Sequence, residues 1–164
     1  MSMFNEIVAG AAGGTAGGLA MFAVRIVGTQ TGFITHSQPD KFERGVAERT
    51  GFAKEQDREQ QKELAIAEHF LLSAGLGAGY GFLRGLFKPP SIPDGIVYGL
   101  AIYAMLLGGI GPTLGITRKP HEKPKSSLGG ELFVHLLFGT VTAAAVDRLR
   151  RRTDRTRFHA EFNR

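Results

Sequence analysis

The chain contains no cysteine and no tryptophan, and only seven of its 164 residues are proline. Without cysteine, the protein has no disulfide framework, no thiolate-bound zinc or iron–sulfur centre and no thiol nucleophile. A collagen-like chain is also excluded, because proline is scarce and glycine follows no three-residue period. Glycine is nevertheless abundant, and its 23 residues are about twice the usual share. The sequence therefore requires a fold that tolerates this much glycine.

Charge is missing from long stretches, although the mean hydropathy of -0.04 is that of an ordinary soluble protein. No Asp, Glu, Lys or Arg occurs in residues 7–24 or 95–117, and neither run has the polar stripe of a soluble amphipathic helix. About 20 apolar helical residues cross a hydrocarbon core of about 30 Å. We therefore expect an all-α integral membrane protein, a single domain with four transmembrane helices packed through glycine and other small residues. The expected spans are about 6–28, 64–87, 95–117 and 127–149, the second and fourth with ionisable residues near one end.

Polar residues gather between and beyond these spans. The segment 29–63 ends in a run of strong helix formers that enters the second span without glycine or proline, which predicts one long helix starting outside the membrane. Within this charged segment, residues 40–52 have the spacing of a short interfacial amphipathic helix. A basic tail, 148–164, continues the fourth helix. Pro112 removes a backbone hydrogen bond and should kink or end the third.

Four spans place both termini on one side of the membrane, and the dense arginine of the tail favours the cytoplasmic side. Arg25 and Arg84 lie near span ends, where such side chains can extend towards the lipid headgroups. The net charge of +5 is then explained by residues that flank the membrane. Nucleic-acid binding is not expected, because the sequence shows no coherent basic surface with a groove-reading element. The expected partners are membrane lipids and other membrane-protein subunits or a second copy of the chain.

Small residues recur at every fourth position along the spans. These positions are Gly10, Gly14 and Gly18 in the first span, Ser73, Gly77, Gly81 and Gly85 in the second, and Gly139 in the fourth. Such spacing lines one helix face with small side chains, so that two helix backbones can approach closely. No lysine stands where a P-loop needs one and no strand precedes the glycines, so we expect helix packing rather than phosphate binding.

Four ionisable residues lie inside the spans, towards the same membrane face: Glu68, His69, Glu131 and His135. An ionisable side chain within a span is costly unless it is paired or hydrated, so function is the default hypothesis. Three interpretations stay open, namely a structural or headgroup-level role, a proton or ligand site, and a divalent metal site. The spacing fixes no third close ligand, so we assign no metal, cofactor or catalytic residue.

A local pattern links the second and fourth spans. His69 is followed one helical turn later by Ser73, and His135 is followed in the same way by Gly139. The two patterns suggest that spans three and four repeat spans one and two in parallel orientation.

Three short motifs occur in order in the second half of the chain. They are His69-x3-Ser73 followed by Gly79-Tyr80, Pro112-x2-Gly115, and the run Glu131-Leu-Phe-Val-His135-Leu136 before a basic tail. Together, over residues 68–152, they resemble the YagU-like family of small bacterial inner-membrane proteins. The resemblance implies a multi-pass protein of the bacterial inner (cytoplasmic) membrane, from a family without an established activity. A looser likeness, in four glycine-rich spans alone, is to the Tim17-like translocase family.

These features favour a non-enzymatic integral membrane protein, either an accessory subunit or a helper of membrane homeostasis, that acts through helix–helix contacts. The alternative is a small transporter or channel component that moves protons or a cation through Glu68, His69, Glu131 and His135. An enzyme is not favoured, because no nucleophile–base set or cofactor motif stands out.

Overall fold

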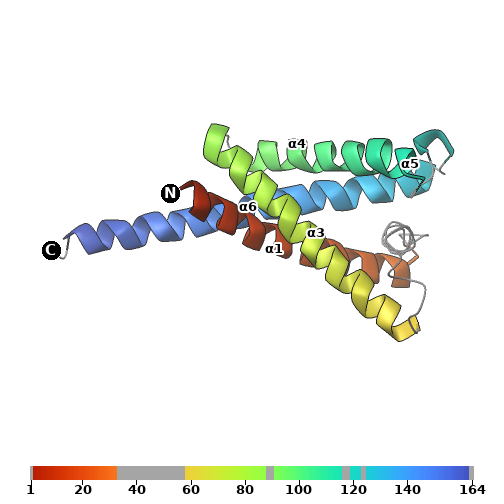
Figure 1. The fold of residues 1–164 in the computed structure, drawn as a ribbon, viewed down its shortest axis with the longest axis horizontal. Coiled ribbons are helices and arrows are strands. Elements are labelled where there is room, and N and C mark those ends of the chain that lie inside the picture. The colour runs from red at the N-terminus through yellow and green to blue at the C-terminus, as the bar shows by residue number, and fades with distance from the viewer. Residues whose placement is uncertain (1, 33–57, 88–90, 116–118, 123–124, 163–164) are drawn as a thin grey trace.

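The computed structural model describes residues 2–32, 58–87, 91–115, 119–122 and 125–162 (Figure 1). Its elements are α1 (Met3–Gln30), α3 (Arg58–Phe87), α4 (Ser91–Tyr103), the π-helical η1 (Ala104–Ile110), α5 (Gly111–Thr113), the 3-10 turn η2 (Pro120–Glu122) and α6 (Lys125–Phe162). Within these residues the regular structure is entirely helical, and α4, η1 and α5 follow one another without a break.

Four helices are long and apolar enough to cross a membrane, at Met3–Gln30, Glu63–Phe87, Ile92–Thr113 and Leu128–Thr153. The prediction of an all-α chain with four such helices is confirmed. The third helix ends at Thr113, before the predicted 117, while α6 continues well beyond the predicted 149.

Local sequence explains where the first helix begins and where the first and third membrane-length helices end. Ser2 caps α1, since its Oγ accepts a hydrogen bond from the backbone N–H of Asn5 at 3.3 Å. Gly32 follows this helix with φ +73°, and Gly115 follows α5 with φ +65°, a left-handed conformation that glycine adopts without strain. Pro112 lies in the first turn of α5, one residue before that helix ends. A π-helical stretch precedes this proline, and the third helix ends shortly after it, at Thr113 before the left-handed Gly115.

Of the charged segment, the structure describes residues 29–32, at the end of α1 and just after it, and the part from Arg58 onward, which forms the first turns of α3. This part is continuous with the membrane-length helix, as the run of helix formers predicted. The predicted interfacial helix at 40–52 lies outside the described residues.

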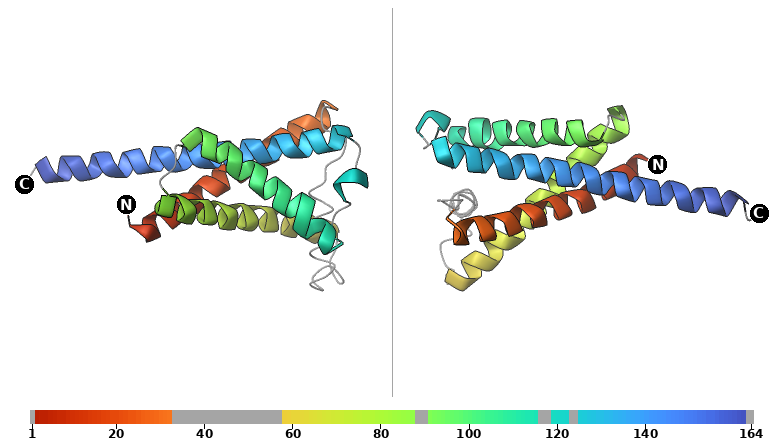
Figure 2. Two further views of the ribbon diagram at one scale, coloured as in Figure 1. Left: turned by 90° about the horizontal axis from the view of Figure 1, so that it is seen from above. Right: turned by 180° about the vertical axis from the view of Figure 1, so that it is seen from behind.

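The four long helices are arranged as two antiparallel pairs. Helix α1 packs against α3, α4 packs against α6, and α1 also packs along α6, which joins the two pairs (Figures 1 and 2). The four helices converge near the N-terminus and the connection between α3 and α4. At the other end the α1–α3 pair and the α4–α6 pair diverge, and α6 extends alone towards the C-terminus (Figures 1 and 2).

Helices α1 and α3 approach backbone to backbone. A Cβ atom built on Gly14 would overlap the carbonyl oxygen of Ser73 and lie 2.6 Å from Gly77 Cα. One built on Gly10 would lie 2.8 Å from Gly81 Cα. Real Cβ atoms do not approach other atoms so closely, so these positions of the interface exclude any residue larger than glycine.

The remaining small residues of the predicted set also lie between helices. A Cβ on Gly18 would meet Ser73 Oγ at 2.5 Å, and one on Gly85 would meet the sulfur of Met3 at 2.8 Å. A Cβ on Gly139 would lie 2.6 Å from the backbone nitrogen of Gly99 in α4. Close approach through glycine therefore occurs in both helix pairs.

A second glycine face of α1 contacts α6. A Cβ on Gly13 would lie 2.8 Å from Val146 Cγ2, and one on Gly17 would lie 2.5 Å from Thr142 Oγ1. Apolar core residues fill the space beside these contacts, in one cluster built from Ala9, Tyr80, Ala143 and Val146 and another built from Met21, Ile102, Val134 and Phe138. Helix α1 thus packs against its own partner α3 with one glycine face and against α6 of the other pair with a second.

Candidate functional site

His69 and Glu68 lie on α3 towards the diverging end, and His69 faces α1. Its Nε2 is 3.1 Å from the backbone carbonyl oxygen of Gly18, and its ring lies 6.1 Å from that of Phe22. Both residues are half-buried. The bond to Gly18 joins two helices that glycine has already brought together, so His69 has a structural contact at this position.

Glu131 and His135 are both buried on α6. The Nδ1 atom of His135 is 2.7 Å from the backbone carbonyl oxygen of Glu131, one turn earlier in the same helix. The imidazole also meets the ring of Tyr103, at the end of α4, edge-on at 5.6 Å. His135 is therefore held between α6 and α4 by a local hydrogen bond and an aromatic contact.

The two predicted histidines thus lie at different interfaces, His69 at that of α1 with α3 and His135 at that of α4 with α6. The two helices that carry them, α3 and α6, diverge at this end (Figures 1 and 2). Within the part of the chain that the structure describes, no three His, Asp or Glu residues are grouped so as to hold a metal ion. The arrangement supplies no observation for the metal interpretation, and the proton or ligand interpretation stays a hypothesis.

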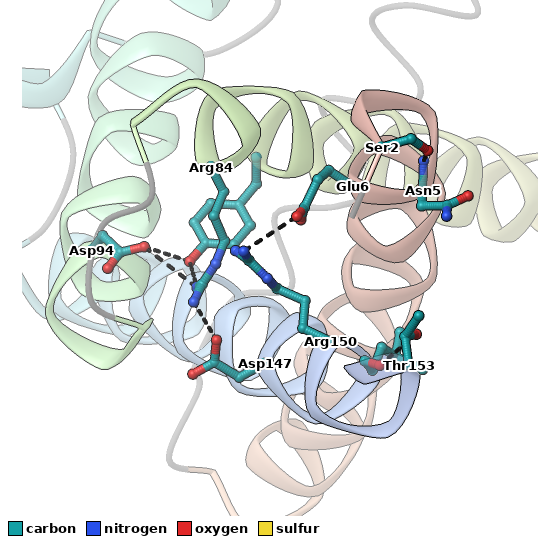
Figure 3. A network of polar contacts seen from close by, with 10 residues as sticks. Ser2, Asn5, Glu6, Arg84, Asp94, Asp147, Arg150 and Thr153 are labelled. Carbon is teal, nitrogen blue, oxygen red and sulfur yellow. Dashed lines mark hydrogen bonds and ion pairs between the residues drawn. The ribbon is translucent and has the colours of Figure 1, made fainter. Parts of the chain in front are cut away.

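A second group of polar side chains, which the sequence reasoning missed, lies at the opposite end, where all four helices converge. We call it the charged cluster, and it consists of Glu6 from α1, Tyr80 and Arg84 from α3, Asp94 from α4, and Asp147 and Arg150 from α6 (Figure 3). Each long helix contributes at least one ionisable residue to it.

Arg84 lies at the centre of the charged cluster and is only 6% exposed. Its guanidinium forms an ion pair with Asp147, lies 3.8 Å from Asp94 and donates a hydrogen bond to the Tyr80 hydroxyl at 2.9 Å. The same hydroxyl donates to Asp94 at 2.5 Å. Arg84 therefore does not extend outward, because carboxylates from α4 and α6 and the phenol of Tyr80, one turn earlier in α3, draw the guanidinium inward.

A second ion pair of the charged cluster joins α1 to α6. Glu6 is 3% exposed, and its Oε1 lies 3.3 Å from a guanidinium nitrogen of Arg150 (Figure 3). Among the described residues, no hydrogen-bond partner is present for Glu6 Oε2, Arg84 Nε or Asp94 Oδ1, all of which are buried. Removing one member of such a pair leaves an uncompensated buried charge and typically costs about 3–5 kcal/mol. The charged cluster is therefore a strong determinant of how the helices fit together.

Comparison of the chain with protein-family models, curated proteins and solved structures gives no match. The resemblance to the YagU-like family stays a prediction from the three motifs.

Proposed function

We propose that the protein is a non-enzymatic, multi-pass integral membrane protein that acts as an accessory subunit or a helper of membrane homeostasis, through helix–helix contacts. The observation that carries this proposal is that charged side chains lie inside the helix bundle while apolar side chains cover its outside. Buried charges pair with one another across the helices, whereas large apolar side chains point outward on every long helix.

The outward apolar residues include Phe4 on α1, Leu71 and Phe87 on α3, Val97 on α4 and Phe133 on α6. Leu71 and Phe87 are 77% and 74% exposed. So much exposed apolar surface marks a membrane or protein contact site rather than a free aqueous surface. Lipid chains and the helices of other subunits are the partners that such faces accept.

We place the protein in the bacterial inner membrane, in line with its resemblance to the YagU-like family. The converging end, with both termini, is proposed to face the cytoplasm. Arg148, Arg151 and Arg152 are exposed at this end of α6, and basic residues at helix ends concentrate on the cytoplasmic side.

One observation favours a second candidate, the small transporter or channel component. Glu131 and His135 are both buried inside a membrane-length helix, and ionisable residues in such positions often belong to ion or proton pathways. This candidate requires that the two side chains act on a transported ion rather than only support α6.

A single preparation separates the two candidates. The chain is purified in mild detergent, and native mass spectrometry identifies the protein chains and lipids that accompany it. We expect a stoichiometric partner subunit or a retained lipid. The same preparation is reconstituted into liposomes that contain a pH-sensitive dye, beside Glu131→Gln and His135→Ala.

An accessory protein shows no proton flux above that of empty liposomes. A flux in the wild type that both variants abolish, at unchanged protein level, would replace the proposed function with the transporter. Loss of protein level in both variants would assign Glu131 and His135 to the structure of α6.

A further inference from the structure

The sequence repeat extends over residues 69–84 of α3 and 135–150 of α6, the second helix of each pair. At one constant interval, His69, Ser73, Gly77, Leu83 and Arg84 of α3 correspond to His135, Gly139, Ala143, Leu149 and Arg150 of α6. The shared pattern runs from the diverging end, where the two histidines lie, to the charged cluster, where the two arginines lie.

The corresponding small residues make the same kind of contact in the two pairs. In the first pair, a Cβ on Gly14 of α1 would press against Ser73 and Gly77 of α3. In the second pair, a Cβ on Gly95 of α4 would lie 2.7 Å from both the Gly139 oxygen and the Ala143 Cβ of α6. Helices α1 and α4 also run in the same direction, as do α3 and α6 (Figure 1). The α1–α3 pair and the α4–α6 pair are therefore equivalent helix hairpins.

The corresponding arginines reach across to the other hairpin. Arg84 of the first hairpin pairs with Asp94 and Asp147 of the second. Arg150 of the second hairpin pairs with Glu6 of the first (Figure 3). The hairpins thus exchange Arg–carboxylate pairs, and both exchanges lie at the converging end.

The contact between α3 and α4 is of a different kind from the glycine contacts. It depends on two tyrosines, since Tyr98 donates a hydrogen bond to the Leu76 carbonyl oxygen at 2.5 Å and its ring centroid lies 5.0 Å from that of Tyr80. Beyond these side chains the two helices diverge (Figures 1 and 2). Two hairpins, each packed backbone to backbone, therefore meet along α1 and α6 and are connected by charge at one end.

We infer that the exchanged Arg–carboxylate pairs form a latch that sets the angle between two equivalent hairpins. Each hairpin is stiff because its helices touch through glycine, and the two hairpins touch each other along the α1–α6 contact at Gly13 and Gly17. A change at the latch therefore rotates one hairpin against the other about that contact and changes their separation at the far end. Rigid-body movement of this kind is one of the common ways in which helical proteins switch state. The equivalent residues His69 and His135 lie towards the end whose separation the latch controls. This inference goes beyond the proposed function and does not depend on it.

The absence of cysteine allows a direct test in the full-length chain. Spin labels are attached to cysteines that replace Ile66 of α3 and Phe133 of α6, both exposed and both near the diverging end. A reference pair replaces Leu86 and Ile92, which are exposed on either side of the short α3–α4 connection. Distances are measured by pulsed electron resonance in lipid nanodiscs.

The latch variants are Arg84→Gln and the near-isosteric Glu6→Gln, which removes one exchanged pair. We expect each to shift or broaden the distance distribution of the far pair by a few ångström, on the order of the helix shifts seen in switching proteins. The distribution of the reference pair stays unchanged, because a short connection holds those residues.

Two controls make the result specific to the latch. Arg151→Gln removes an exposed arginine from the same helix and should change neither distribution. Exchange of the charges, with Glu6→Arg and Arg150→Glu in one chain, should bring the far-pair distribution back towards that of the wild type. The latch is refuted if Glu6→Gln, folded and monodisperse, leaves the far pair unchanged. It is equally refuted if Arg151→Gln shifts that pair as much as the latch variants do.

Discussion

Substitution of Gly14 by alanine adds one methyl group at the tightest part of the α1–α3 interface. The new Cβ would overlap the carbonyl oxygen of Ser73 and lie 2.6 Å from Gly77 Cα. Both neighbours are backbone atoms, which cannot rotate away as a flexible side chain would. Restoring an ordinary carbon–carbon separation of about 3.5 Å from Gly77 Cα would require the helices to separate locally by about 0.9 Å, and relieving the overlap with the Ser73 oxygen requires more.

Comparison with Gly75→Ala in α3 isolates the free-energy cost of this clash. A Cβ on Gly75 has nothing within 4 Å, so this variant adds the same methyl group without a clash. Alanine is also the better helix former, by about 0.8–1 kcal/mol, and this gain is common to both variants. Their difference therefore measures the clash alone, and overpacking of this kind costs about 1–3 kcal/mol.

The assay is thermal stability in mild detergent, scored as the temperature at which half of the protein leaves the monodisperse size-exclusion peak. For a chain of this size, about 1–3 kcal/mol corresponds to a fall of about 3–10 °C relative to Gly75→Ala. If Gly14→Ala is as stable as Gly75→Ala, the close approach of α1 and α3 does not hold and the argument from glycine packing fails.

Three further variants probe other contacts in the same assay. Gly18→Ala brings a methyl group to 2.5 Å from Ser73 Oγ and should destabilise the protein. A second change in the same chain, Ser73→Gly, removes that oxygen and should recover most of the lost stability. Additive effects of the two changes would contradict the contact. Tyr80→Phe deletes the hydroxyl that accepts from Arg84 and donates to Asp94, so we expect a cost of about 1–3 kcal/mol, and a neutral result would show that the hydroxyl is dispensable. Asp147→Asn removes one of the two carboxylates that pair with the buried guanidinium and should cost about 3 kcal/mol, whereas a loss below about 1 kcal/mol would mean that Asp94 or water already compensates this charge.

The helical architecture could be predicted from the sequence because the patterns that indicate it are periodic and lie within single helices. The two charge-free runs and the four-residue spacing of glycine repeat over several turns, so an error of a few residues at a boundary does not change the conclusion. The predicted end of the third span is too late because the third helix ends at Thr113, before the left-handed Gly115, although the charge-free run continues to 117.

The charged cluster could not be predicted in the same way, because its members come from four helices and each is unremarkable alone. Glu6 and Asp94 look like ordinary helix-start acids, and Arg84 like an interfacial residue. One signal was available in the sequence. Tyr80 and Arg84 are one turn apart on the same helix face, which places a phenol beside the guanidinium before any other helix is considered.

Glycine packing alone leaves the register of the helices undetermined, and the charged cluster supplies what is missing. Gly10 and Gly14 are four residues apart, as are Gly77 and Gly81, so α1 could slide by four residues along α3 and still place glycine against glycine. Such a slide moves α1 by about 6 Å, at 1.5 Å per residue. Glu6, now 3.3 Å from a nitrogen of Arg150, would then be buried without its partner. Because an unpaired buried charge costs several kcal/mol, the ion pair selects one register among those that glycine permits. Close approach and register thus have separate origins, the first in small residues along the helices and the second in charges at one end.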